Sequence, residues 1–222
     1  GRRRRRRQMT TFTFSPRSLS SSLRSTSTST STSTSLTMGL EINIRMVGRK
    51  NSIESTSYLQ EGYNEYTKRL SSTIQLSTTY HKSNDDLLKG LQVDSKKGFG
   101  IICLDEKGAM YTSTEFSSAM YHWMEEYGSR LVFVIGAAEG LPAEIKQYQY
   151  QYNNQYSGGG EGKKGKGNGS GNGSGSGGIF NRSPIFMSLS KMTFTHPWAR
   201  TILVEQIYRA SEIHKGSGYH KD

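Results

Sequence analysis

Residues 99–135 read FGIICLDEKGAMYTSTEFSSAMYHWMEEYGSRLVFVI. The runs Phe99–Leu104 and Leu131–Ile135 are short and wholly apolar, which is typical of strands covered on both faces, as in a parallel sheet. Between them, apolar residues recur at helical spacing from Phe116 to Tyr127. The order strand, helix, strand with short connections predicts an α/β fold with a parallel sheet flanked by helices.

The sequence before this stretch adds further elements of the same kind. Residues 40–46 alternate apolar and polar side chains, the pattern of a half-buried strand. Apolar residues from Leu59 to Leu70 recur at helical spacing, with charged residues on the other face. A weaker strand is expected over 74–78 and a short helix over 85–91. Ser113 or Thr114 is expected to open the helix that follows.

The sequence after this stretch contains one more strand, over 185–189, and a long helix. Thr195 or His196 opens that helix, Pro197 occupies its first position and Gly216 closes it. Its apolar stripe consists of Leu203, Ile207, Ala210 and Ile213.

A low-complexity insertion is expected over 147–182, first rich in Gln and Tyr and then in Gly and Ser. Such a composition cannot bury a core. Its lysines are expected either to touch RNA or to lie on a solvated spacer.

The charge of the chain is unevenly distributed. The net charge is +11, but residues 1–38 hold eight arginines and no acidic residue. The glycine-rich tract 157–178 holds three lysines and one glutamate, which adds a net +2. About +1 is left for the remaining residues, so the charge of the whole chain is a poor guide to what the folded surface binds.

Residues 1–38 are rich in Arg, Ser and Thr and lack the apolar run of a secretory signal. This composition predicts an organellar transit peptide. Two alternatives are translated untranslated sequence and an arginine arm that binds nucleic acid. Met9 or Met38 is the expected true start, and a plastid is favoured over a mitochondrion.

Several classes of protein are excluded by composition. No stretch approaches the roughly eighteen consecutive apolar residues of a membrane span, which argues against a membrane protein. Cys103 is the single cysteine, so neither an internal disulfide framework nor a cysteine-based zinc site is expected. The histidines show no metal-ligand spacing, and the sequence predicts no metal.

Two segments at the ends of strands are candidates for a binding site. The segment 134–141 runs from a strand into a loop of small residues, where Gly136 and Gly140 would allow a close backbone approach or a positive φ. It matches neither a dinucleotide-binding nor a phosphate-binding glycine motif, and a simple tight turn is the alternative. In the segment 189–194, backbone amides and hydroxyls could hold a polar ligand, while Met192 and Phe194 could cover an aromatic ring. An ordinary strand–helix loop is the alternative there.

The segment SLSKMTFTHPWARTILVEQIYRASEIHKGSGYHK (188–221), together with FVIGAAEGL (133–141), resembles the ribosomal large subunit methyltransferase H family. The resemblance covers about 39–146 and 183–222. It implies a SPOUT-type α/β fold with a deep trefoil knot in the C-terminal half. It also implies a homodimer in which the last helix packs at the interface, in keeping with the apolar stripe from Leu203 to Ile213.

By this resemblance the protein uses S-adenosylmethionine to methylate N3 of a pseudouridine in large-subunit rRNA. Two alternatives are a catalytically idle RNA-binding or ribosome-assembly factor with the same fold, and a related methyltransferase that acts on another nucleotide. Because the folded part is nearly neutral, the expected substrate is an assembled ribosome or large-subunit particle and not naked RNA.

The resemblance also assigns site residues. The cofactor is expected to contact residues at three strand ends: Leu104, Gly136, Leu189, Ser190, Lys191, Met192, Thr193 and Phe194. Tyr219 and His220, in a tail that lies across the dimer, are the expected residues for substrate positioning or proton handling. Arg200, Arg209 and Lys221 are the expected contacts to RNA phosphate, although Arg209 could equally be structural.

Overall fold

The computed structural model describes residues 39–55, 57–156 and 179–219. The predicted leader 1–38 therefore lies outside the described residues, as do the glycine-rich part of the insertion and the last three residues, His220, Lys221 and Asp222. Among the described helices, none is long and apolar enough to cross a membrane.

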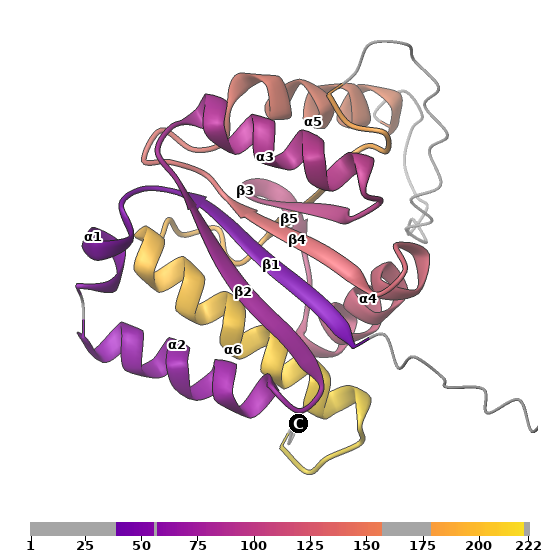
Figure 1. Cartoon of the computed structure of the whole chain (residues 1–222). Coiled ribbons are helices and arrows are strands. Elements are labelled where there is room, and N and C mark those ends of the chain that lie inside the picture. Colours follow the sequence, from indigo (N-terminus) through magenta and orange to yellow (C-terminus); the bar gives the residue numbers. More distant parts are fainter. Residues whose placement is uncertain (1–38, 56, 157–178, 220–222) are drawn as a thin grey trace, which may run out of the picture. The chain divides into compact units, whose positions relative to one another are not determined.

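The described residues form a five-stranded parallel sheet between two layers of helices (Figure 1). The strand order is β2-β1-β4-β3-β5. The strands are β1 (Leu40–Val47), β2 (Ile74–His81), β3 (Gly100–Met110), β4 (Arg130–Ile135) and β5 (Ile185–Ser188). The helices are α1 (Lys50–Glu54), α2 (Ser57–Leu70), α3 (Asn84–Lys96), α4 (Ser113–Glu126), α5 (Ala143–Tyr156) and α6 (His196–His214). Helices α3 and α5 cover one face, and α2, α4 and α6 cover the other.

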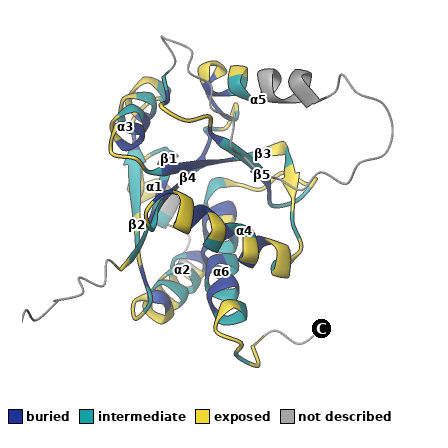
Figure 2. Ribbon diagram, turned by 90° about the vertical axis from the view of Figure 1, so that its right-hand side faces the viewer, coloured by how far each residue is buried: buried dark blue, intermediate teal, exposed yellow. Residues whose placement is uncertain are grey.

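The two central apolar runs are buried on both faces, as their sequences predict. In β4, Leu131 and Phe133 point into the core shared with α4 and α6, while Val132 and Val134 point into the core under α3 and α5. Figure 2 shows this band of buried residues along the middle strands. The prediction of a parallel α/β sheet flanked by helices is confirmed.

Several element boundaries differ from the predicted ones. Strand β3 continues to Met110, and α3 is longer than the predicted helix over 85–91. The residue that caps α4 is Thr112, and not Ser113 or Thr114. Thr112 accepts a hydrogen bond from the Glu115 amide and the Glu115 carboxylate accepts one from the Thr112 amide, which together satisfy two free amides at the helix start.

The insertion is narrower than predicted at both ends. Helix α5 continues through the Gln- and Tyr-rich segment to Tyr156. The Ile179 amide donates to the Tyr148 hydroxyl at 2.8 Å, and Phe180 is buried against the same ring. The Asn181 amide then donates to Ser95 Oγ at 2.8 Å. Residues on both sides of 157–178 are therefore fixed to the α3 and α5 layer, because tyrosine rings supply apolar surface that composition alone undervalues.

Three of the four residues of the predicted apolar stripe of α6 pack within the chain. Leu203, Ile207 and Ala210 are fully or almost fully buried in the core between α2, α4 and the sheet. The sequence-based argument that linked this stripe to a dimer is therefore wrong. A helix that covers a sheet packs its most apolar face against the core of the same domain, so only its outer face can contact a partner.

A buried polar cluster joins β1, β2 and α3. The Arg45 guanidinium donates to both carboxylate oxygens of Asp94, at 2.9 Å for Nη2, and its Nη1 donates to Nε2 of His81 at 2.9 Å. Because an arginine can only donate, Nε2 of His81 is the acceptor and Nδ1 carries the proton that is shared with Asp86. Gly90 leaves room for this arrangement, since a Cβ there would lie 2.8 Å from Arg45 Nη1.

The cluster predicts a loss of stability in mild acid. Burial, with a contribution from Arg45, lowers the pKa of His81. His81 is therefore protonated near pH 6.5 in the unfolded chain but only at lower pH in the folded chain. The contribution of His81 to the free energy of unfolding is therefore at its maximum above about pH 6.5 and falls as the pH drops below that value. We expect His81→Gln to flatten this decline between about pH 7 and 5 in urea titrations. Equal slopes for the wild type and the variant would contradict the assignment.

Candidate cofactor cavity at the strand ends

A cavity of about 740 Å³ opens at the carboxyl ends of β3, β4 and β5. Three chain segments form it: residues 104–106 from β3, residues 135–141 at and after the end of β4, and residues 188–190, 192–197 and 199 from the end of β5 to the start of α6. Ser52 of α1 and Lys146 of α5 complete the lining. Because all five strands are parallel, their carboxyl ends share one edge, which is where open α/β sheets bind ligands.

The loop after β4 is folded tightly on itself. The Ala137 amide donates to the Gly140 carbonyl at 3.0 Å, and the Gly140 amide donates to the Ala137 carbonyl at 2.8 Å. Gly140 has a φ of +87°. A Cβ on Gly136 would lie 2.4 Å from the carbonyl carbon of Gly140. Gly136 is therefore needed for the close approach of the two backbone segments in the loop. Of the two glycines, Gly140 is the one with a positive φ.

Strand β3 forms a bulge at the cavity. Its register against β5 shifts between Leu104 and Ala109, which turns the intervening residues out of the ladder. Oδ1 of Asp105 accepts hydrogen bonds from the Lys107 amide at 2.9 Å and from Gln149 Nε2 at 3.3 Å. The bulge therefore fixes one carboxylate in the cavity wall, and the buried Gln149 of α5 holds it from behind.

The segment between β5 and α6 forms a polar turn with apolar side chains on its outside. The Ser188 hydroxyl donates to the Ser190 carbonyl at 2.8 Å, and the Met192 amide donates to the Ser190 hydroxyl at 3.0 Å. These bonds tie the turn to the last residue of β5. Met192, which is 74% exposed, and Phe194 stand at the cavity mouth.

The lining combines an apolar part with an excess of negative charge. Leu104, Ile135, Leu141 and Leu189 supply apolar surface. The charged side chains of the lining are Asp105, Glu106, Glu139 and Lys146. Such a cavity suits a ligand that carries an aromatic ring, hydroxyl groups and a positive charge, because carboxylates accept hydrogen bonds from hydroxyls and pair with cations.

Most predicted cofactor residues meet in this one cavity. Leu104, Gly136, Leu189, Ser190, Met192, Thr193 and Phe194 all line it, whereas Lys191 is exposed and does not. Sequence reasoning missed the acidic residues Asp105, Glu106 and Glu139, and also His196. A signal was available, since Asp105 and Glu106 directly follow the apolar run Phe99–Leu104, Glu139 lies in the glycine-containing loop after β4, and His196 opens the last helix.

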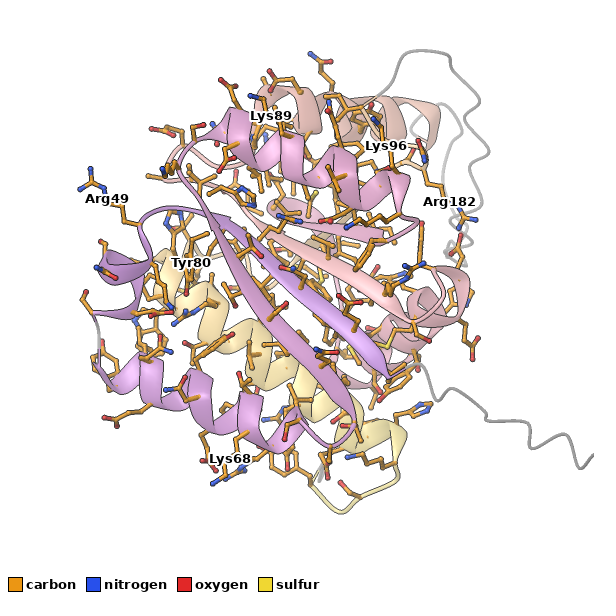
Figure 3. The ribbon with its side chains drawn as sticks, viewed as in Figure 1. Arg49, Lys68, Tyr80, Lys89, Lys96 and Arg182 are labelled. Carbon is orange, nitrogen blue, oxygen red and sulfur yellow. The ribbon has the colours of Figure 1, made fainter. Side chains whose placement is uncertain are left out.

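Arg200 does not lie where an RNA phosphate could reach it. Its side chain is 0% exposed, its Nη1 donates to the Tyr80 hydroxyl and its Nη2 donates to Gln60 Oε1 at 2.6 Å. The guanidinium also stacks 4.2 Å from the centre of the Tyr63 ring. Figure 3 labels Tyr80, on the side of the sheet that faces α6. The predicted phosphate contact is therefore wrong: Arg200 instead ties the first turns of α6 to α2 and β2.

Two of the predicted catalytic and RNA residues, Tyr219 and Arg209, lie far from the cavity of their own chain. Tyr219 and Arg209 lie at the C-terminal end of α6, whereas the cavity borders its N-terminal end. A 19-residue helix separates the two ends by roughly 28 Å. His220 and Lys221 lie outside the described residues. Within the described part of the chain, no group of three His, Cys, Asp or Glu side chains could hold a metal.

The fold and its strand-end cavity define a class of protein. A family model described as "Predicted SPOUT methyltransferase" matches residues 40–153 and 171–220, most of the chain. The protein is therefore a methyltransferase of the SPOUT class, which implies a methyl donor of the S-adenosylmethionine type. The gap in this match, 154–170, is shorter than the predicted insertion and falls within it.

Individual relatives narrow the class further. The chain is 36% identical over 182 residues to the ribosomal RNA large subunit methyltransferase H of Protochlamydia amoebophila, covering 82% of this chain and 99% of that protein. It is 33% identical over 169 residues to the protein of the same name from Prochlorococcus marinus strain SARG, covering 75% and 88%. A putative member from Methanoregula boonei is 31% identical over 180 residues, covering 74% and 91%. The chain belongs to the ribosomal RNA large subunit methyltransferase H family.

The loop geometry predicts the effect of adding one methyl group to Gly136. In Gly136→Ala the Cβ collides with the backbone of Gly140, so the loop must open and the cavity wall moves. We expect the affinity for S-adenosylmethionine to fall at least tenfold, about 1.4 kcal/mol, in titration calorimetry. Gly62→Ala is the control, because its Cβ would meet only Thr201 Cγ2 at 3.4 Å. Unchanged affinity in Gly136→Ala would contradict this account of the loop.

Proposed function

We propose that the protein transfers a methyl group from S-adenosylmethionine to N3 of a pseudouridine in the large-subunit rRNA of an organellar ribosome. The observation that carries the proposal is the single cavity that joins the ends of three parallel strands. Seven of the eight residues assigned to the cofactor by family likeness line it. The substrate is inferred from the names of the relatives, which are rRNA methyltransferases.

The residues of the cavity fit S-adenosylmethionine in chemical character. Its three carboxylates suit the ribose hydroxyls and the positive charges of the amino and sulfonium groups, and Lys146 suits the ligand carboxylate. The apolar side chains of Leu104, Ile135 and Leu189 offer a surface for the adenine ring. When bound, the cofactor supplies an electrophilic methyl group. The role of the chain is then to hold the two reactants in line and to keep water away from them.

Proton removal from the substrate needs a group near the mouth of the cavity. The imide N3–H must lose its proton for the nitrogen to act as a nucleophile, and a positioned acceptor contributes about 10²- to 10⁴-fold. We assign substrate positioning or proton handling to Tyr219 and His220. Because Tyr219 packs on Tyr208 in the C-terminal half of α6, whereas the cavity borders the N-terminal end, the tail is proposed to serve the cavity of a second copy.

A homodimer with antiparallel α6 helices would satisfy this requirement. In such a two-fold pair, the C-terminal end of each α6 lies beside the N-terminal end of the other, and hence beside its cavity. The proposed contact face carries Trp198, Ile202, Glu205 and Arg209, which follow one another at helical spacing on the outer side of α6.

Exposed aromatic residues extend this face toward α2. Trp198 is 45% exposed and Tyr58 is 61% exposed, and their rings pack edge to face with centroids 6.1 Å apart. Large exposed aromatic side chains that adjoin each other mark interaction surfaces more often than isolated ones do. They lie on the cavity side of α6, where Phe194 and Met192 are also exposed.

Two further proposals concern the chain path and the compartment. The C-terminal half is proposed to form the trefoil knot of the family, which rests on the match to the family model. A plastid location, ahead of a mitochondrial one, rests on the composition of residues 1–38.

A direct RNA contact is proposed for Arg49, which is exposed between β1 and α1 and points away from the body in Figure 3.

The function predicts a specific modified nucleoside. Purified protein, S-adenosylmethionine with a labelled methyl group and large ribosomal subunits should yield 3-methylpseudouridine in nucleoside mass spectrometry. Because the folded part is nearly neutral, we expect isolated rRNA fragments to react at least tenfold more slowly than subunits. Cofactor binding without methyl transfer would favour an idle assembly factor. A labelled nucleoside other than pseudouridine would favour another RNA substrate.

The dimer predicts opposite outcomes for two exposed apolar residues. Trp198→Glu places a charge in the proposed interface, so we expect a monomer in sedimentation experiments and a loss of activity of at least tenfold. Val93→Glu is the control, because Val93 is equally exposed but lies on α3, on the other side of the sheet. A dimer that survives Trp198→Glu would contradict the proposed face.

A further inference from the structure

A cluster of tyrosines and arginines surrounds the last described residue of the chain. It lies where the C-terminal ends of α2 and α6 lie side by side (Figure 1). The ring of Tyr219 packs edge to face on Tyr208, with centroids 5.1 Å apart, and Tyr208 packs on Tyr66 at 5.6 Å. We call this cluster the tail seat. It consists of Tyr66, Arg69, Glu205, Tyr208 and Arg209, with Tyr219 as its occupant.

Two arginines close the seat from either side. The Arg209 guanidinium lies 5.4 Å from the centre of the Tyr219 ring, and that of Arg69 lies 5.7 Å from the Tyr208 ring. Each is held by a carboxylate one turn earlier on its own helix, Glu205 at 2.6 Å and Glu65 at 2.8 Å. Burial and a hydrogen bond with Tyr66 raise the pKa of Tyr219, as expected for a hydroxyl that lies among these groups.

The seat lies at the margin of the hydrophobic core, where Tyr66 and Tyr208 pack against it, and its outer part is exposed to solvent. Arg69 is exposed, and Tyr219 remains 37% exposed although it contacts two helices. Chain ends normally fray unless something ties them down. Here an edge-to-face ring contact and a cation–π contact converge on one tail residue. Such a set of contacts fixes the point and the direction in which the chain leaves the body.

We propose that the tail seat is the positioning element of the methyl transfer: it holds Tyr219 so that the tail of one protomer reaches the cavity of its partner. This inference rests on the proposed function and dimer. The seat lies at the opposite end of α6 from the cavity of the same chain, so an anchored tail cannot fold back to that cavity. Arg209, whose guanidinium is already occupied by Glu205 and Tyr219, is a positioning residue and not a phosphate contact.

Single variants separate positioning from the alternatives. Tyr208→Leu and Arg209→Gln should lower kcat by about tenfold to hundredfold, while the affinity for S-adenosylmethionine stays unchanged. The dimer mass is expected to stay unchanged in Tyr208→Leu, which lies outside the proposed contact face. An arginine that contacts phosphate would instead raise KM and weaken the salt dependence of binding. His214→Asn is the control, because His214 stacks on Tyr121 near the same helix end but outside the seat. Hydrogen exchange at residues 217–219 should rise in the seat variants alone.

Mixed dimers give the decisive test. Pairing Tyr208→Leu with Gly136→Ala leaves one intact site, made of the cavity of the first protomer and the tail of the second. We expect about a quarter of the wild-type activity, since half of the dimers are mixed and each has one of two sites. Pairing Tyr208→Leu with Tyr219→Ala leaves no intact site, and no recovery is expected.

The outcomes are distinguishable. Recovery in the second mixture, or full activity of both seat variants alone, would overturn the seat while leaving the proposed function in place. No recovery in the first mixture would also overturn it, because the seat would then act on more than its own tail. A wild-type protein that binds cofactor but transfers no methyl group to ribosomal subunits would overturn the proposed function, and the seat proposal with it.

Discussion

The parallel pairing of β3 with both β4 and β5 is the constraint on which the rest of the structure depends. It places the ends of three strands at one edge, so that segments distant in sequence face a common space. The bulge after Leu104 and the self-closed loop at Gly136 then shape that space, and both need backbone contacts too close for a larger residue. A Cβ on Gly108 would lie 2.5 Å from the Met187 backbone, and one on Gly136 would meet Gly140.

Helix α6 links the two functional ends of the molecule. Its N-terminal end borders the cavity, and its C-terminal end holds the tail that is proposed to act on the partner. Its inner face packs against the core, so only its outer face is available for contact with a second copy. Arg200 fixes its first turns by donating to Tyr80 and Gln60. A buried arginine is tolerable there because its charge is met by hydrogen bonds and by the Tyr63 ring.

Charge plays different parts in different regions of the chain. The overall +11 comes mainly from residues outside the described fold, whereas the cavity carries an excess of carboxylates. An acidic cavity suits a cationic cofactor and would repel RNA phosphate. Under the proposed function, the RNA would be guided by surfaces around the cavity, by shape and by the proposed tail of the partner. This division explains why a nearly neutral body is compatible with an RNA substrate.

The sequence by itself determined the parallel sheet and both central strands, because apolar runs and helical spacing are local signals. The eight cofactor residues were assigned by family likeness, and seven of them line the cavity. It misplaced Arg200, the stripe of α6 and the limits of the insertion, because whether a side chain faces core, solvent or partner depends on which elements pack against it. The acidic lining and the seat of Tyr219 were decided only by the tertiary structure. They arise where β3, α5, α2 and α6 meet, and residues far apart in sequence leave no joint pattern in a single chain.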